Sequence, residues 1–264
     1  MVSLFIRCSA ETQELLSFYL WERGATGIVE RDLPGGGVEL QAFFEERIML
    51  DGAPGYEARW QEEPETDWVR TFHDAWQPFK VGRRFFLAPE WSEEATPENR
   101  LRLPLRPGRA CGSGKHPATQ LALRALEDFL LPEETVLDVG TGSGILSEAA
   151  LLLGARRVLA CDIDPEAAVV AAQNLTHYGA RVLVYAGSVR SVRTGAADFS
   201  VANINAESLC SLMPELARVT GRCAVVTGFP ERDAGGVARA ATRFFDLPAR
   251  LAQDGWVALI LMRG

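Results

Sequence analysis

Thr135-Val-Leu-Asp-Val-Gly-Thr-Gly-Ser-Gly144 is the stretch that decides the fold of this chain. A short apolar run, typical of a buried strand, leads into glycines at alternate positions, Gly140, Gly142 and Gly144. An Ala- and Leu-rich segment follows at once, so the pattern predicts a strand, a tight turn and a helix N-terminus. Glycines permit positive φ and remove Cβ atoms where the backbone must touch a ligand. The pattern therefore indicates a nucleoside-type cofactor site, against the alternative of a turn that needs glycine only for its geometry.

The next predicted strand, residues 157–161, ends at Asp162, and Asp164-Pro165 begins a further helix. An acid at this point accepts hydrogen bonds from ribose hydroxyls. The dinucleotide fingerprint requires a third glycine at its sixth position, where this chain has Ile145. Asp138, two residues before the first glycine, instead resembles the acid of motif I in S-adenosylmethionine (SAM) methyltransferases. SAM is therefore the expected cofactor, and NAD is the alternative.

A second glycine-rich segment, Gly112-Ser-Gly-Lys115, resembles the end of a phosphate-binding P-loop. That motif requires a glycine where this chain has Arg109, and a Ser or Thr where it has His116. The preceding run, Leu101-Arg-Leu-Pro-Leu-Arg-Pro107, is a poor central strand because proline cannot donate to the ladder. These departures disfavour an NTPase.

Taken together, four segments resemble the bacterial ribosomal protein L11 methyltransferases. They are Gly108-Arg-Ala-Cys-Gly-Ser-Gly-Lys-His-Pro-Ala-Thr119, Val136–Gly144, Cys161-Asp-Ile-Asp-Pro165 and Val201-Ala-Asn-Ile204. Residues 67–76 and Phe85-Phe-Leu-Ala-Pro89 also resemble the linker and the first catalytic strand of that family. The resemblance covers residues 67–264. It departs from the family at Cys111, where a Phe is usual, and at Ala118, which replaces the first of two threonines.

The resemblance implies a set of site residues. It assigns cofactor binding to Thr119, Asp138, Gly140, Gly142, Gly144, Asp162, Ser188 and Asn203. It assigns the contact to the amine substrate to Asn203, for which a buried strand-end Asn bonded to loop backbone is the alternative. His116 either removes a proton from the amine or, as we favour, braces the glycine-rich loop. No metal is required, and only three histidines are present.

Net charge is unevenly distributed along the chain. Residues 1–66 carry 13 acidic and 5 basic side chains, and the rest of the chain has 22 of each. An acidic region attached to a catalytic one suggests docking of a basic partner, which a ribosomal protein provides; a merely soluble acidic surface is the alternative. Direct binding of nucleic acid is disfavoured, because this region lacks a basic stripe.

Other features of composition fit an enzyme of the cytoplasm. The five cysteines form no C-x-x-C pair, so a zinc site or a disulfide framework is not expected. We expect neither a signal peptide nor a membrane helix, since no apolar run reaches about 20 residues. The expected form is a monomer.

We expect three parts: an acidic α+β domain over residues 1–65, a linker helix over 66–80 and a methyltransferase domain over 81–264. The first part has strands at 2–8, 27–31, 38–44 and 56–62 and a helix from Ser9 to about Arg23, which fits a ferredoxin-like sandwich. From residue 117 onward, strands and helices alternate, with strands predicted at 135–139, 157–161, 181–185, 197–203, 222–228, 245–251 and 256–262. The fold class is therefore α/β, a seven-stranded doubly wound sheet whose last two strands form a hairpin at Gln253-Asp-Gly255.

The sequence thus predicts a SAM-dependent protein N-methyltransferase that modifies lysine side chains and the α-amino group of ribosomal protein L11. The alternatives are a SAM methyltransferase for another protein or a small molecule, and a SAM-binding scaffold without activity.

Overall fold

In the computed structural model, the chain divides into two compact units, Met1–Ala75 and Trp76–Gly264. The structure describes residues 2–9, 12, 16–17, 19–20, 23–25, 27–33, 37–48, 58–62, 77–106 and 114–264. Most of the predicted linker helix, and with it the predicted boundary at residues 65 and 66, falls outside these residues. The end of that predicted helix differs: Phe79 and Lys80 belong to a strand.

The first unit contains a four-stranded antiparallel sheet in the order β2-β3-β1-β4. Its strands are β1 (Val2–Ser9), β2 (Gly27–Leu33), β3 (Gly37–Phe44) and β4 (Ala58–Glu62). Leu16 and Leu20, which lie in helical conformation, pack with Leu4, Ile6 and Leu40 in one apolar core. This strand order is that of a ferredoxin-like sheet, but much of the chain between its strands lies outside the described residues. The ferredoxin-like assignment therefore stays a prediction.

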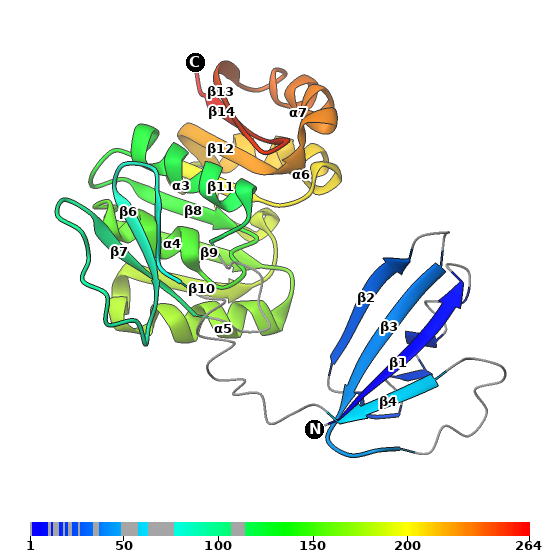
Figure 1. Cartoon of the computed structure of the whole chain (residues 1–264). Helices are drawn as coiled ribbons and strands as arrows, with labels where there is room; N and C mark the ends of the chain where they lie inside the picture. The colour runs from blue at the N-terminus through cyan, green and yellow to red at the C-terminus, as the bar shows by residue number, and fades with distance from the viewer. Residues whose placement is uncertain are drawn as a thin grey trace. The chain divides into compact units, whose positions relative to one another are not determined.

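The second unit is built on a seven-stranded sheet in the order β10-β9-β8-β11-β12-β14-β13 (Figure 1). The strands are β8 (Thr135–Val139), β9 (Arg157–Asp162), β10 (Val182–Ala186), β11 (Ala197–Asn203), β12 (Thr220–Pro230), β13 (Asp246–Gln253) and β14 (Trp256–Met262). The pairings among β8 to β12 are parallel, and β14 pairs antiparallel with both of its neighbours. The predicted doubly wound sheet and its terminal hairpin are confirmed. The strand order reverses between β8 and β11, where ligands of open α/β sheets bind.

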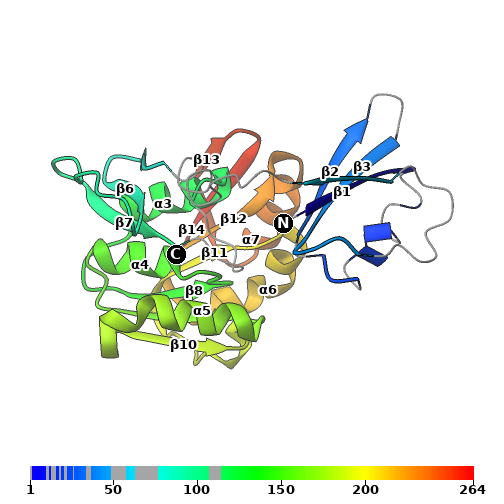
Figure 2. The same cartoon turned by 60° about the horizontal axis from the view of Figure 1, so that its bottom comes forward.

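Helices cover both faces of this sheet (Figure 2). They are α3 (Pro117–Phe129), α4 (Ile145–Leu152), α5 (Pro165–Leu175), α6 (Ala206–Val219) and α7 (Ala234–Ala241). Residues of α3 and α4 share one buried cluster with Val136, Val158 and Phe199, and residues of α6 and α7 share another with Leu137 and Val139. Because β8 is buried throughout, the turn that follows it starts from a rigid position.

A small three-stranded sheet packs on the α4 side of the second unit. The sequence predicted only one of its strands. Its strands are β5 (Phe79–Val81), β6 (Phe85–Pro89) and β7 (Leu101–Leu105), and β6 and β7 run parallel. The predicted strand at 85–89 is β6. Pro104 is tolerated in β7 because that strand lies at the edge of the small sheet.

Within the described residues, no helix combines the length and apolar character needed to cross a membrane. The same residues contain no cluster of three or more His, Cys, Asp or Glu side chains suited to a metal ion.

Candidate cofactor and amine site

Asp138 holds the glycine turn to the strand that precedes it. Its Oδ2 accepts hydrogen bonds from the Thr141 hydroxyl at 2.8 Å, from the Ser147 hydroxyl at 2.7 Å and from the Ser147 backbone N–H at 3.1 Å. Asp138 is fully buried. One carboxylate oxygen therefore ties together the end of β8, the turn and the first turn of α4.

The other oxygen of this carboxylate has a different environment. Asp138 Oδ1 is buried and has no hydrogen-bond partner in the part of the chain that the structure describes. Burial raises the pKa of Asp138 to about 6, with a smaller upward effect from the charge of Asp162, although the bonds from Ser147 and Thr141 act in the opposite direction. The site thus contains a carboxyl whose charge changes just below neutral pH and whose second oxygen lacks a hydrogen-bond partner among the described residues.

Asp162 joins the second strand to the same turn. Its Oδ2 accepts from the backbone N–H of Gly142 at 2.9 Å, and its Oδ1 accepts from the backbone N–H of Asp164 at 3.0 Å. The side chain is half-buried, so lone pairs on both oxygens are available to hydroxyl groups of a ligand. The structure therefore brings Asp162 to the glycine turn, at the tip of β9.

Asn203 lies at the end of β11, the third strand that contributes to this site. Its Nδ2 donates to the Thr119 hydroxyl at 3.1 Å, so α3 and β11 are joined by two predicted site residues. The next residue, Ile204, packs on the glycine turn: a Cβ on Gly140, whose φ is +72°, would lie 2.3 Å from Ile204 Cγ2. Glycine is required at position 140 because both the backbone angle and the space exclude a side chain.

His116 makes a structural contact at the start of α3. It is the N-cap of α3, where its Nδ1 accepts the backbone N–H of Ala118 at 3.2 Å. Its ring also meets Trp256 edge to face, with 4.3 Å between ring centres. The ring nitrogen that would receive a proton is thus already used to cap a helix, which favours the bracing role over general-base catalysis.

Ser188 lies beyond the end of β10, the strand next to β9. Its hydroxyl accepts the backbone N–H of Arg190 at 3.4 Å and caps the short 3₁₀ helix η2 (Val189–Ser191). The backbone N–H of the preceding residue, Gly187, donates to the Asp162 carbonyl at 2.7 Å. Ser188 is therefore connected to the tip of β9 through the backbone, and its hydroxyl caps η2.

A buried ion pair behind the glycine turn was not predicted from the sequence. Glu148, in the first turn of α4, has only 3% of its side chain exposed and accepts from Arg106 Nη1 at 2.6 Å. His177 Nε2 lies 3.5 Å from the other carboxylate oxygen of Glu148. Arg106 also contacts the exposed Glu90 at 2.6 Å. These partners come from segments far apart in the sequence, so no local pattern reveals them.

The two carboxylates that contact Arg106 allow a matched test of burial. We expect Glu148→Gln to lower the free energy of unfolding by about 3 kcal/mol, because it removes one member of a buried pair. Glu90→Gln removes the charge from a contact of the same length at a side chain that is 57% exposed, and it should cost less than about 1 kcal/mol. Urea denaturation of both variants measures the difference; equal losses would show that burial does not determine the strength of this pair.

A second comparison separates backbone strain from close packing. Gly140 and Gly255 have φ values of +72° and +75°, but a Cβ on Gly255 would meet nothing within 4 Å. Both Gly→Ala variants incur about 1–2 kcal/mol of left-handed strain. Gly140→Ala should lose about 1–3 kcal/mol more, because Ile204 is stiff at χ1 and cannot move aside freely. The free energies of unfolding from urea titrations test this, and equal losses would contradict the packing argument.

Comparisons with known proteins identify the family of this chain. The ribosomal protein L11 methyltransferase (PrmA) family matches residues 37–264. The ribosomal protein L11 methyltransferase of Symbiobacterium thermophilum is 38% identical over 209 residues, which are 78% of this chain and 68% of the relative. That of Staphylococcus aureus (strain MRSA252) is 30% identical over 253 residues, 88% of this chain and 81% of the relative. Some other relatives are matched over 65% of their length.

A solved structure extends the agreement to the fold. The crystal structure of ribosomal protein L11 methylase from Lactobacillus delbrueckii subsp. bulgaricus has a TM-score of 0.65 and 30% identity, covering 71% of this chain and 99% of that chain. The fold, the order of the motifs and these matches lead to one conclusion: the chain belongs to the ribosomal protein L11 methyltransferase family.

Proposed function

We propose that this chain is a SAM-dependent N-methyltransferase that methylates lysine side chains and the α-amino group of ribosomal protein L11. The observation that carries the proposal is the junction of the glycine turn with Asp162, at 2.9 Å from Gly142 N, beside the Asn203–Thr119 pair. This arrangement joins a cofactor-type turn to polar side chains suited to an amine, at the carboxyl ends of three parallel strands.

The residues present fit SAM, which supplies a methyl group activated by a sulfonium. Asp138 provides a buried carboxylate beneath the turn with an unpaired oxygen, which favours a positively charged ammonium group. Asp162 provides acceptors for ribose hydroxyls, and the adjacent Ile163, 82% exposed, provides apolar surface for a flat ring. The remaining predicted contacts, Gly140, Gly142, Gly144 and Ser188, surround the same strand ends.

Asn203 would orient the attacking amine. Its amide nitrogen is committed to Thr119, while its carbonyl oxygen has no partner among the described residues. That oxygen can accept an N–H of a neutral amine and so direct the lone pair of the amine. A lysine amine has a pKa of about 10.4 in water, so the amine must lose a proton before it attacks. Asn203 would then orient the lone pair of the neutral amine.

The proposal assigns capture of the substrate to the acidic first unit. The excess of acidic side chains over residues 1–66 complements a basic ribosomal protein. In this proposal the chain acts in the cytoplasm as a monomer, without direct contact to nucleic acid or membrane.

The test is methyl transfer from methyl-labelled SAM to unmethylated ribosomal proteins, with modified residues identified by mass spectrometry. We expect label on L11 at lysine side chains and at its amino terminus, and at least about a hundredfold less with Asp162→Ala, since a lost charged hydrogen bond costs about 3 kcal/mol. Asp233→Ala, which removes an acid outside the site, is the control. Label on another protein, or none despite binding of S-adenosylhomocysteine, would refute the L11 assignment; no binding would refute the use of SAM.

The raised pKa of Asp138 predicts a pH dependence of cofactor binding. Asp138 is ionised above its pKa of about 6, and only the ionised form attracts an ammonium group. The affinity for S-adenosylhomocysteine should therefore fall about tenfold from pH 7.5 to pH 5. Calorimetric titrations at both values test this: Asp138→Asn should bind weakly with a flat profile, and Asp162→Asn should keep the slope. A flat profile for the unmodified chain would exclude Asp138 as the origin.

A further inference from the structure

One face of the seven-stranded sheet lacks a covering helix at its outer strands. Parallel strands are normally covered on both faces, but the connection from β10 to β11 contains only the three-residue η2. Val189 and Val192 of this connection cover Leu137 and Cys161. Further out, Leu183 of β10 remains 59% exposed.

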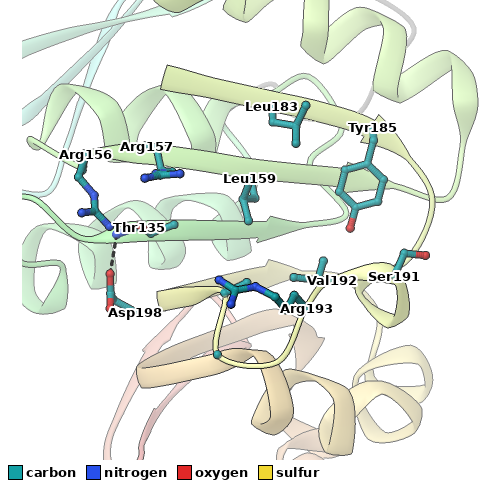
Figure 3. Close-up of a pocket in the computed structure, with 12 residues that line it drawn as sticks. Thr135, Arg156, Arg157, Leu159, Leu183, Tyr185, Ser191, Val192, Arg193 and Asp198 are labelled. Carbon is teal, nitrogen blue, oxygen red and sulfur yellow. Dashed lines mark hydrogen bonds between the residues drawn. The ribbon is translucent and has the colours of Figure 1, made fainter. Parts of the chain in front are cut away.

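The uncovered face forms a groove of about 550 Å³ (Figure 3). Its floor comes from alternate residues of neighbouring strands, because Thr135 pairs with Arg157 and Leu159 pairs with Leu183 in the sheet. The Tyr185 ring lies near the carboxyl end of β10. The segment after η2, with Val192 and Arg193, borders the groove on the side away from β10 (Figure 3).

Three arginines line the end of the groove near the amino ends of the strands. Arg156, Arg157 and Arg193 are all exposed, and none has a carboxylate within 4 Å among the described residues. Arg156 donates to the Thr135 hydroxyl at 3.0 Å. Asp198 also lines the groove, but its Oδ2 accepts the backbone N–H of Thr135 at 2.8 Å. With three arginines and one aspartate in its lining, the groove combines an aliphatic floor with a net positive charge.

We propose that this groove binds an amphipathic helix of a partner protein, with apolar residues on one face and acidic residues in its last turn. A helix that takes the place of the missing crossover helix runs antiparallel to the strands, so its C-terminus lies over Arg156, Arg157 and Arg193. Cations stabilise both the C-terminal end of a helix and acidic side chains there. Leu159 and Leu183 receive the apolar face.

The same observations favour a protein helix over nucleic acid. The floor offers leucines rather than a set of aromatic rings for base stacking, and the Tyr185 hydroxyl is bonded to the Ser188 carbonyl at 3.3 Å. Residues 67–264 carry 22 acidic and 22 basic side chains, so this part of the chain has no net positive charge to attract a long polyanion.

The experiment uses the full chain and a synthetic amphipathic peptide of about four helical turns, with leucines on one face and glutamates in its last turn. A second peptide has lysines in place of the glutamates. Fluorescence anisotropy should show at least about tenfold tighter binding of the glutamate peptide. Arg157→Glu combined with Arg193→Glu should reverse this preference, and Leu183→Gln should weaken both peptides.

The control variants make the same kinds of substitution, two Arg→Glu changes and one exposed apolar residue to Gln, outside the groove. Arg232→Glu with Arg239→Glu, and Val169→Gln on α5, should leave peptide affinity unchanged. Affinities are compared only between variants whose midpoints of unfolding are equal. Equal affinity for both peptides, or none up to about 1 mM, would overturn the proposal, as would tighter binding of a single-stranded RNA. Affinity for S-adenosylhomocysteine, measured in parallel, reports on the cofactor site alone, so failure of the groove is distinguished from failure of the proposed function.

Discussion

The carboxylate of Asp138 is the interaction on which the site depends. A glycine-rich turn has little conformational restriction of its own, yet a cofactor site requires a fixed backbone. Asp138 supplies that restriction through the bonds from Thr141 and Ser147 to one oxygen. The cost is a buried, partly unsatisfied carboxyl, visible in its raised pKa of about 6. Such a cost is typical of functional sites, where stability is exchanged for a group prepared to bind a ligand.

Other interactions hold the glycine turn and α4 to further elements of the unit. Asn174 Nδ2 donates to the Ser143 carbonyl at 2.8 Å, so α5 also holds the turn. Glu148 lies one residue beyond Ser147 and binds Arg106, which connects α4 to the end of β7. The turn is thus held from the strand before it, the helix after it and two further elements. A displacement at any of them would change the backbone of the candidate cofactor site.

Local sequence was sufficient for the elements of the second unit but not for the contacts behind the site. Alternating strands and helices, and the glycine pattern after Val139, predicted the sheet because their signals lie within a few residues. The partnership of Glu148 with Arg106 spans distant segments and follows no periodicity. The strand at 101–105 was hidden because Pro104 argues against a central strand, whereas it occupies an edge. His116 could be identified as a candidate site residue from the sequence, but its cap at Ala118 could not.

Burial differs between the central strand β8 and the edge strand β10 of the sheet. β8 is buried at every position, while β10, at the edge, is partly or fully exposed along its length. Asp138 lies in the buried strand β8 and the glycine turn follows it directly, so close packing resists displacement of both. The edge strand β10 pairs with one strand only, and its exposed side chains can meet another surface. A sheet organised in this way can hold the candidate site rigid at the carboxyl end of β8 while side chains of β10 stay accessible to a partner.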